Sequence, residues 1–332
     1  MKDGRFCFAV VGTGSIADRF LDALSRTEGT CAAAVFSRRK ETGDAFAAKH
    51  GGLAVFTDYD RLFSDGEIDG VYIATPHFCH KEQTVRALRA GRHVLVEKSA
   101  ALNVRDFVDM RREAEAAGRI LLEAMRPDFD PAYDALRAGL SRIGRIRRVS
   151  LTFCQYSSRY DAFRRGEVKN AFDPAIGNSA LLDIGVYPLH IALSLFGMPK
   201  KMQVGQVYLE NGFEGAGNLL LSYEKQGFSA DIAYSKVQDA VLPSAIEGED
   251  GAVTIDKLTQ PHEIRLFLRT GGEETLFRTE EENNMRFEIQ AFLSAVRGER
   301  TVGQYLDLTE KTLTLTDAAC PYGKERQESV GK

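Results

Sequence analysis

The sequence predicts an α/β fold in two domains: a doubly wound parallel sheet, then a C-terminal α/β domain with an open, mostly antiparallel sheet. The first third of the chain alternates apolar strands with helices, as in parallel sheets joined by crossovers. From Met202 to about Phe277 the pattern is short strands with no long helix between them. At 332 residues the chain is long enough for two cores, which we place at 1–123 and 124–320, with a polar tail at 321–332.

The elements of the first domain follow from their apolar spacing and their boundaries. Phe6–Val11 is apolar without alternation, which suits a strand buried on both faces. A helix follows it, because Ile16, Phe20 and Leu24 recur at helical spacing. The other expected strands are 31–36, 71–74, 93–96 and 120–122, and the other expected helices are 41–50, 81–90 and 104–117.

The second domain begins after residue 123. A helix is expected from Asp130-Pro131 to about Gly139, because the pair supplies a cap and a first-turn proline. Expected strands are 147–155, 217–223, 228–235, 244–247, 251–255 and 263–269, and the closing helices are 286–297 and 306–319. An open sheet needs a cover on its second face, which a partner subunit could supply.

Composition excludes several classes of protein. With 44% hydrophobic and 27% charged residues, the chain is neither disordered nor fibrous. A net charge of −4 argues against general affinity for nucleic acid or anionic membranes. The sequence has no run of 18 apolar residues, so no membrane span is predicted. The strand at Phe6 leaves no room for a signal peptide. The cysteines form an odd set without metal spacing, so we expect buried free thiols in a reduced, cytoplasmic protein: Cys7, Cys31, Cys79, Cys154 and Cys320.

The turn after the first strand carries the clearest functional signal. Its glycines, Gly12 and Gly14, allow a tight turn and the approach of a phosphate to bare backbone, and Ala17 lets the next helix pack closely. The N-terminus of that helix offers unpaired N–H groups and the positive end of its dipole. A glycine-rich turn can be purely structural, but a G-x-G-x-x-A turn between strand and helix favours dinucleotide binding.

The turn after the second strand predicts which dinucleotide is bound. An NAD-specific site usually places Asp or Glu here, to hold the ribose 2′-hydroxyl. This chain instead has Ser37-Arg38-Arg39-Lys40, a hydroxyl and three cations that would attract a 2′-phosphate. A solvated basic loop is the alternative. We therefore expect NADP(H) to be preferred, with NAD(H) possible.

Two later turns lie at the same edge of the predicted sheet, where ligands of doubly wound sheets bind. Thr75-Pro76-His77-Phe78-Cys79-His80 follows one strand, with the Thr75 hydroxyl placed to meet a cofactor. His77 and His80 lack partners at ligand spacing, so no metal site is predicted. Glu97-Lys98-Ser99 follows the next strand, where a partly desolvated ammonium could hydrogen-bond a substrate oxygen.

A polar triplet marks the second domain. Asp183, Tyr187 and His190 are spaced i, i+4 and i+7, so one helical face carries a carboxylate, a phenol and an imidazole. Pro188 is tolerable only in the first turn of that helix. A surface face could show the same residues by chance, but their apolar neighbours favour a buried polar site.

Taken together, these motifs resemble the glucose–fructose oxidoreductase, inositol dehydrogenase and rhizopine-catabolism (Gfo/Idh/MocA) family. The resemblance spans nearly the whole chain and includes the glycine turn, Thr75-Pro76, Glu97-Lys98 and residues 182–187 in order. Ser37-Arg38, Glu123-Ala124 and the Asp-x-x-x-Tyr form are most similar to the dihydrodiol dehydrogenase and NADP-dependent sugar dehydrogenase branch. The resemblance implies a Rossmann domain, then a C-terminal domain whose open sheet forms homodimers or homotetramers.

The resemblance also implies an activity: hydride transfer between a nicotinamide and a carbinol or carbonyl carbon of a sugar, polyol or diol, without metal. Lys98 would hydrogen-bond the reacting oxygen, Asp183 would orient the substrate or the lysine, and Tyr187 would be the acid/base, with His190 as its alternative. The alternatives are an NADP(H)-binding sensor or scaffold without turnover, and an NAD-dependent glycosidase. The expected cofactor contacts are Gly12, Thr13, Gly14, Ser15, Ile16, Ser37, Arg38, Thr75, Pro76, His77, His80, Glu97, Lys98 and Arg126.

One departure from the family concerns the peptide after Lys98. The family commonly has Glu-Lys-Pro, and here Ser99 replaces the proline. A cis bond before a residue other than proline costs about 2.5–4 kcal/mol. We therefore expect a trans Lys98–Ser99 bond.

Overall fold

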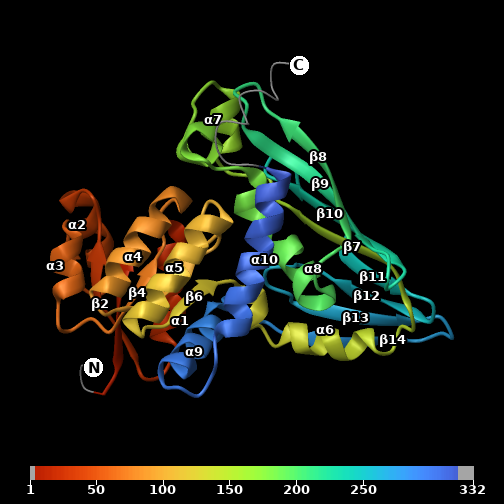
Figure 1. The fold of residues 1–332 in the computed structure, drawn as a ribbon, viewed down its shortest axis with the longest axis horizontal. Coiled ribbons are helices and arrows are strands. Elements are labelled where there is room, and N and C mark those ends of the chain that lie inside the picture. The colour runs from red at the N-terminus through yellow and green to blue at the C-terminus, as the bar shows by residue number, and fades with distance from the viewer. Residues whose placement is uncertain (1–3, 321–332) are drawn as a thin grey trace. The chain divides into compact units, whose positions relative to one another are not determined.

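The chain folds into two compact units (Figure 1). The structure, a computed structural model, describes residues 4–320. Within residues 4–320, the first unit runs to Arg126 and includes Asn283–Glu310, and the second comprises Pro127–Glu282 and residues 311–320. The sequence-based division assigned all of 124–320 to the second domain, whereas residues 283–310 pack with the first unit. The tail predicted at 321–332 lies outside the described residues.

The first unit is built on a six-stranded sheet whose neighbouring strands are all parallel. The strands are β1 (Phe6–Val11), β2 (Thr30–Phe36), β3 (Ala54–Phe56), β4 (Gly70–Ile73), β5 (His93–Glu97) and β6 (Leu121–Ala124), in the order β3-β2-β1-β4-β5-β6. The chain winds outward from β1 and then returns to β4 on its other side. The order therefore reverses between β1 and β4, the point where such sheets bind ligands. The predicted doubly wound sheet is confirmed.

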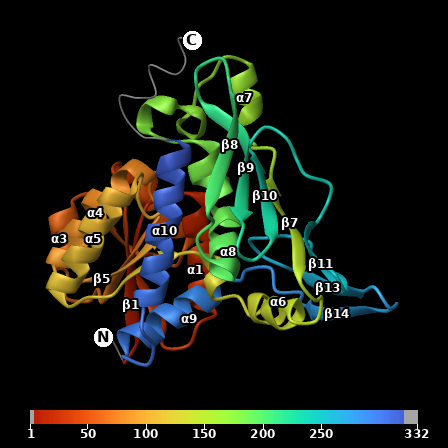
Figure 2. The ribbon, with the colours of Figure 1, turned by 45° about the vertical axis from the view of Figure 1, so that its right-hand side comes forward.

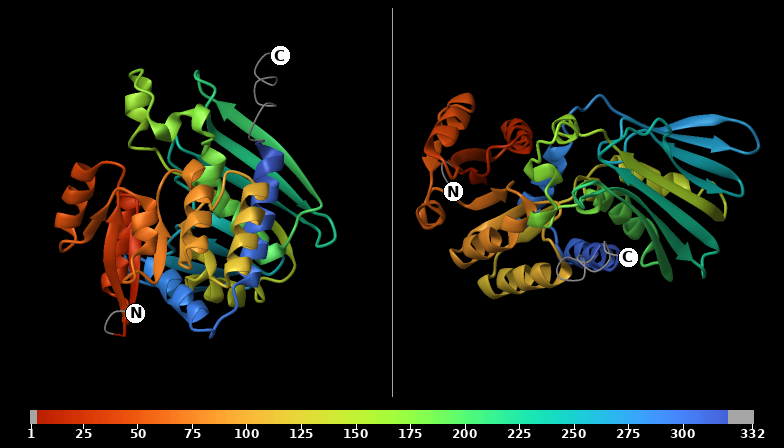
Figure 3. Two further views of the ribbon diagram at one scale, coloured as in Figure 1. Left: turned by 60° about the vertical axis from the view of Figure 1, so that its left-hand side comes forward. Right: turned by 90° about the horizontal axis from the view of Figure 1, so that it is seen from above.

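Helices cover this sheet. They are α1 (Ser15–Ser25), α2 (Lys40–Lys49), α3 (Tyr59–Ser64), α4 (His80–Arg89), α5 (Val104–Ala117) and α9 (Met285–Val296). Helices α4 and α5 lie side by side, as Figure 3 shows. Helix α9 joins the unit through Phe292, whose ring lies 6.0 Å from that of Phe6 and 5.6 Å from that of Phe8. This aromatic contact explains why a segment so late in the chain belongs to the first core.

The second unit contains an eight-stranded sheet in the order β14-β13-β12-β11-β7-β10-β9-β8 (Figure 2). The strands are β7 (Ile146–Cys154), β8 (Lys201–Tyr208), β9 (Glu214–Tyr223), β10 (Phe228–Ser235), β11 (Ser244–Gly248), β12 (Gly251–Ile255), β13 (Glu263–Leu268) and β14 (Glu273–Arg278). All pairs are antiparallel except β7 with β10. The predicted mostly antiparallel sheet is confirmed.

Helices pack on one face of this sheet. They include α6 (Ala132–Leu140) against β12, β13 and β14, and α8 (Val186–Phe196) against β7 and β10. The short α7 (Tyr160–Arg164) and the last helix, α10 (Gly303–Ala319), complete the helices. Strand β9 alternates, since Leu219 and Leu221 are buried while Leu220 is 41% exposed. The sheet thus has a packed face and a face open to solvent along β9.

Two cysteines depart from the predicted free thiols. Cys7 and Cys31 are register partners on the neighbouring strands β1 and β2, with Cα atoms 4.6 Å apart, and they form a disulfide. Side chains of register partners leave a sheet on the same face, so the two sulfurs meet. The prediction of free thiols was wrong for this pair, whereas Cys79, Cys154 and Cys320 form no disulfide within residues 4–320. None of the helices within residues 4–320 has the length and apolarity needed to cross a membrane.

Candidate functional site

The glycine turn lies at the point where the sheet order reverses. Gly12 has φ +117°, and a Cβ there would lie 2.5 Å from the Ala74 carbonyl oxygen. The turn is held from both sides: the Gly12 N–H donates to Phe36 (3.2 Å), and the Ala74 N–H donates to Val11 (2.8 Å). Only glycine fits this close approach of the β1 and β4 ends.

The start of α1 fits an anionic ligand. Gly14 is its N-cap, makes no side-chain cap, and has nothing within 4 Å of where a Cβ would lie. Gly14 and Ser15 are exposed, while Thr13 and Ile16 are half-buried. First-turn N–H groups and the positive dipole end therefore face an uncrowded space bordered by bare backbone. These residues fit the pyrophosphate of a dinucleotide.

The residues after β2 separate into distinct roles. Ser37 is buried, and its N–H donates to the Phe56 carbonyl (3.0 Å). The Lys40 ammonium pairs with Asp44 on its own helix (2.7 Å). Arg38 is exposed and makes no ion pair within residues 4–320. Its charge acts on Cys79, lowering a thiol pKa that burial raises overall. Arg38 is thus an available cation at the end of β2, next to Arg39, which is also exposed.

The turn after β4 is locked by a residue that the sequence analysis did not single out. The Thr75 hydroxyl donates to Gln83 Oε1 (2.6 Å), and Gln83 Nε2 donates to the Tyr59 hydroxyl (2.5 Å). The Tyr59 ring stacks on Phe36, with centroids 3.8 Å apart. This chain of contacts fixes the turn after β4 to the end of β2. Pro76 is exposed and His77 half-buried in the same turn.

His80 joins this turn to the next one. The ring is fully buried, with Nε2 2.8 Å from the Thr75 carbonyl oxygen and Nδ1 2.9 Å from the Ser99 carbonyl oxygen. Burial, together with the nearby Lys98 charge, lowers the pKa of His80 to about 4. A neutral imidazole donates through one ring nitrogen only, so His80 hydrogen-bonds one of these two carbonyl oxygens and packs against the other. The position suits a structural link better than a metal ligand; within residues 4–320, no three His, Cys, Asp or Glu side chains form a cluster able to hold a metal ion.

The Lys98–Ser99 peptide bond is cis, so the prediction of a trans bond was wrong. The prediction used only the local cost of the bond, whereas contacts from distant residues fix its neighbours. His80 lies against the Ser99 carbonyl, and the Ala100 N–H donates to Glu123 Oε1 (2.8 Å). Glu123 Oε2 in turn accepts from the Thr309 hydroxyl (2.7 Å). The segment after Lys98 is thus fixed by tertiary contacts.

Glu97 and Lys98 differ in their surroundings. Lys98 is half-buried at the end of β5. Glu97 is buried and accepts a hydrogen bond from the Tyr72 hydroxyl, and the Tyr72 ring stacks on Phe20 with centroids 3.7 Å apart. Burial raises the pKa of Glu97, and the Lys98 ammonium offsets part of this rise. The ammonium at the ligand-binding edge therefore has a buried carboxyl group beside it.

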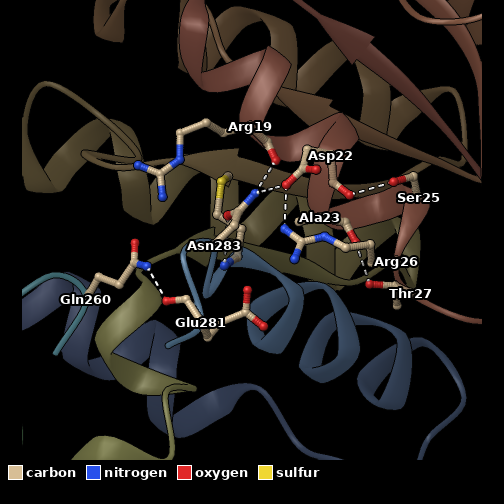
Figure 4. A network of polar contacts seen from close by, with 10 residues as sticks. Arg19, Asp22, Ala23, Ser25, Arg26, Thr27, Gln260, Glu281 and Asn283 are labelled. Atoms are coloured by element: carbon tan, nitrogen blue, oxygen red, sulfur yellow. Dashed lines mark hydrogen bonds and ion pairs between the residues drawn. The ribbon is translucent and has the colours of Figure 1, made fainter. Parts of the chain in front are cut away.

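A further buried carboxyl group, close to Glu97, was not predicted. Glu288 on α9 is 0% exposed, and neither carboxyl oxygen has a hydrogen-bond partner within residues 4–320. Burial and the nearby Glu97 carboxyl raise its pKa well above the usual range, and Arg126 and Arg19 lower it only in part. The segment before α9 is anchored to α1, since Asn283 Nδ2 donates to Asp22 (2.7 Å) and to the Arg19 carbonyl (2.8 Å), as Figure 4 shows.

In the second unit, Asp183 lies on a π-helical turn, Leu181–Gly185, which leads directly into α8. The start of this turn is held because the Leu181 N–H donates to Glu214 Oε2 (3.0 Å). A Cβ on Gly185 would lie 2.7 Å from the Tyr234 ring, so the turn packs closely on β10. Pro188 falls in the first turn of α8, as expected.

The three polar residues predicted on one face have different contacts. Asp183 is 30% exposed at its side chain and pairs with Lys236 (2.7 Å), a residue that the sequence analysis missed. Tyr187 is 4% exposed, and its ring meets Phe153 edge-on, with centroids 5.6 Å apart. Two further contacts engage His190, which is fully buried: Nε2 lies 2.9 Å from the Asp128 carboxylate and Nδ1 3.1 Å from the Thr312 hydroxyl.

Comparisons with known proteins agree with this arrangement. The family described as "Oxidoreductase family, NAD-binding Rossmann fold" matches residues 6–125, and the "GFO/IDH/MocA C-terminal domain" matches 134–254. The chain is 39% identical over 290 residues to scyllo-inositol 2-dehydrogenase (NADP(+)) IolU of Bacillus subtilis, covering 87% of this chain and 88% of the relative. It is 30% identical to trans-1,2-dihydrobenzene-1,2-diol dehydrogenase of Oryctolagus cuniculus, covering 84% and 83%.

Solved structures agree as well. A 3-ketoreductase from Actinomadura kijaniata, in complex with TDP-benzene and NADP, is 25% identical with a TM-score of 0.81, covering 96% of this chain and 97% of that chain. An aldose-aldose oxidoreductase from Caulobacter crescentus shares the fold at 23% identity, with a TM-score of 0.84 and coverage of 99% and 98%. By both of its sequence matches and by its fold, the chain belongs to the Gfo/Idh/MocA family of NAD(P)-dependent oxidoreductases.

Proposed function

We propose that the protein is an NADP(H)-dependent oxidoreductase that interconverts a carbinol and a carbonyl carbon of a polyol or sugar, and that cyclic polyols such as scyllo-inositol are its first candidates. The preference for NADP(H) over NAD(H) rests on the residue that follows β2. Arg38, which is exposed and makes no ion pair with any residue of the described range 4–320, stands where an NAD site would place a carboxylate. The polyol class is supported by the name of the relative that is 39% identical.

Residues of the first unit bind the cofactor and the reacting oxygen of the substrate in this proposal. The glycine turn and the start of α1 bind the pyrophosphate, and Arg38 binds the 2′-phosphate through charge-assisted hydrogen bonds. When bound, the nicotinamide supplies hydride exchange at its C4 atom. Lys98 hydrogen-bonds the substrate oxygen, whose charge changes during the reaction.

Proton transfer to and from the substrate is assigned to a residue of the second unit. Tyr187 is proposed as the acid/base, because both ring nitrogens of His190 face other protein groups. Asp183 orients the substrate through its carboxylate, which is partly exposed and can accept hydrogen bonds from hydroxyl groups. His80 and Glu123 hold the backbone around Lys98.

The test compares turnover with NADP⁺ and NAD⁺ on a panel of inositols, aldoses and diols. Wild-type protein should reduce NADP⁺ with at least one polyol, and Lys98→Met should lower kcat by about 10²–10⁴-fold while still binding NADPH. Arg38→Ala should weaken the binding of NADPH by about tenfold to a hundredfold and leave the binding of NADH nearly unchanged. Arg105→Ala on α5 is the matched control. Equal losses for both cofactors would remove Arg38 from 2′-phosphate recognition.

The same panel separates the alternatives. NADPH binding without turnover on any compound would favour a sensor or scaffold. Tightly held NAD together with cleavage of a glycoside would favour a glycosidase. Unchanged kcat in Lys98→Met would contradict the proposed role of the lysine even if polyol oxidation is observed.

A further inference from the structure

We propose that Lys236 is a positioning residue for the reaction: it holds the Asp183 carboxylate in the orientation that engages the substrate. This inference rests on the proposed function, because it concerns the same reaction. Lys236 follows β10, and Asp183 lies on the turn before α8, so the contact joins two elements of the second unit that are 53 residues apart in the chain.

The Lys236 ammonium is buried among fixed partners. Its residue is 4% exposed, although lysine is rarely buried to this degree without a partner. The ammonium donates to Asp183 Oδ2 (2.7 Å) and to the Ala171 carbonyl (2.7 Å). It also lies 4.9 Å from the centroid of the Phe172 ring and 5.2 Å from that of Phe213. Two hydrogen bonds and two aromatic faces define one location for the charge.

The backbone that carries Lys236 is fixed as well. The Lys236 N–H donates to the Gly215 carbonyl (2.9 Å), and its own carbonyl accepts from the Ser157 N–H (2.9 Å). Its side chain therefore extends from an anchored backbone toward an anchored acceptor. Little rotamer freedom remains to be lost when the ion pair forms, which distinguishes it from pairs between flexible surface side chains.

Asp183 connects this buried charge to solvent. The carboxylate is 30% exposed, so the same group reaches a buried ammonium on one side and the outside on the other. The turn that carries it begins at Leu181, which Glu214 anchors, and it continues into α8, which carries Tyr187. An ammonium that fixes Asp183 thus sets the direction of a carboxylate four residues before the proposed acid/base.

The effect of replacing Lys236 distinguishes a stabilising ion pair from a positioning one. A buried ion pair that only stabilised the fold could be replaced, both partners together, by apolar side chains of similar size, often at little cost. Removing Lys236 alone would remove the ammonium that pairs with Asp183 Oδ2, and small misplacements of a substrate-orienting group reduce turnover strongly. The contribution of Lys236 should therefore depend on the presence of the Asp183 carboxylate.

A double-mutant cycle on the full-length protein tests this dependence, using the polyol that the wild type turns over best. Lys236→Met should lower kcat about tenfold or more, with the dissociation constant of NADPH unchanged. Asp183→Asn should lower kcat at least as much, and the double variant should be no slower than Asp183→Asn. Lys201→Met, which removes an exposed ion pair with Glu224, is the matched control and should leave kcat unchanged.

Three outcomes would overturn the inference. If the fold-loss of kcat in the double variant equals the product of the losses in the two single variants, Lys236 acts independently of Asp183. If Lys236→Met has the kcat of the wild type, Lys236 does not act in the reaction. An active wild type with either result leaves the proposed function standing. A wild type inactive on every compound overturns both. If Lys236→Met does not fold, Lys236→Gln, which keeps a donor for Ala171, enters the same cycle.

Discussion

The buried carboxyl group of Glu288 should make the protein less stable as the pH rises, and Glu288→Gln should remove this loss. The groups that face Glu288 are Glu97 on β5, Arg126 after β6 and Arg19 on α1. Burial and the Glu97 carboxyl outweigh the two arginines, so the pKa of Glu288 is raised well above its ordinary value of 4.5. Its oxygens have no hydrogen-bond partner within residues 4–320, as expected for a carboxyl group that keeps its proton.

The sign and size of the effect follow from proton linkage. A raised pKa means that the folded protein keeps a proton which the unfolded chain has already lost. The stabilisation is therefore complete below about pH 4.5 and is lost as the pH rises through the folded-state pKa. Over this window the free energy of unfolding falls as the pH rises, with a limiting slope of about 1.4 kcal/mol per pH unit for a single proton.

The assay is urea unfolding followed by far-UV circular dichroism between pH 5.5 and 8.5, since the chain contains no tryptophan. Glutamine has the shape of the protonated acid but does not titrate, so the variant should gain stability relative to wild type as the pH rises. Glu310→Gln, which alters a half-exposed carboxylate near Arg111, is the control for a general change of charge. Parallel pH dependences for wild type and Glu288→Gln would refute the reasoning, because Glu288 would then be ionised in the folded protein.

Three further predictions concern the fold. Gly12→Ala should abolish NADPH binding measured by fluorescence titration and lower the melting temperature, because its Cβ would meet the Ala74 carbonyl at 2.5 Å and φ is positive. Phe292→Ala should cost about 3–5 kcal/mol of unfolding free energy by urea titration, since it removes a fully buried ring from the first core. Val207→Asp with Leu220→Asp should yield a smaller species by light scattering if the open face forms the expected oligomer; these side chains are 55% and 41% exposed.

The fold of the first unit could be predicted well because its signals are local. A buried parallel strand is an uninterrupted apolar run, and each helix has its own periodicity and stop residue. The short strand β3 and helix α3 were missed, since three and six residues carry little pattern. The assignment of 283–310 failed for another reason: the helical pattern of α9 is local, but its contact with Phe6 and Phe8 depends on where the chain returns.

Within the candidate site, residues at the ends of strands could be predicted from the sequence. Residues that contact the site from other parts of the chain could not. Gly12, Arg38 and Lys98 could be placed because the doubly wound topology brings strand ends to one edge. Gln83, Lys236 and Glu288 lie within or after ordinary helices and strands, where a polar residue reads as a solvated surface position. Only burial distinguishes them, and burial is a property of the tertiary structure.

The Lys98–Ser99 bond shows the same division between local and tertiary terms. The preference for trans is a property of two residues, and the sequence supports it once serine replaces proline. The observed cis bond lies in a segment whose groups are bound by His80 and Glu123, residues from α4 and β6. Each of these side chains is buried and also contacts another group, His80 the Thr75 carbonyl and Glu123 the Thr309 hydroxyl. Buried side chains from distant parts of the sequence thus converge on the ends of β4 and β5, and these strand ends carry the proposed chemistry.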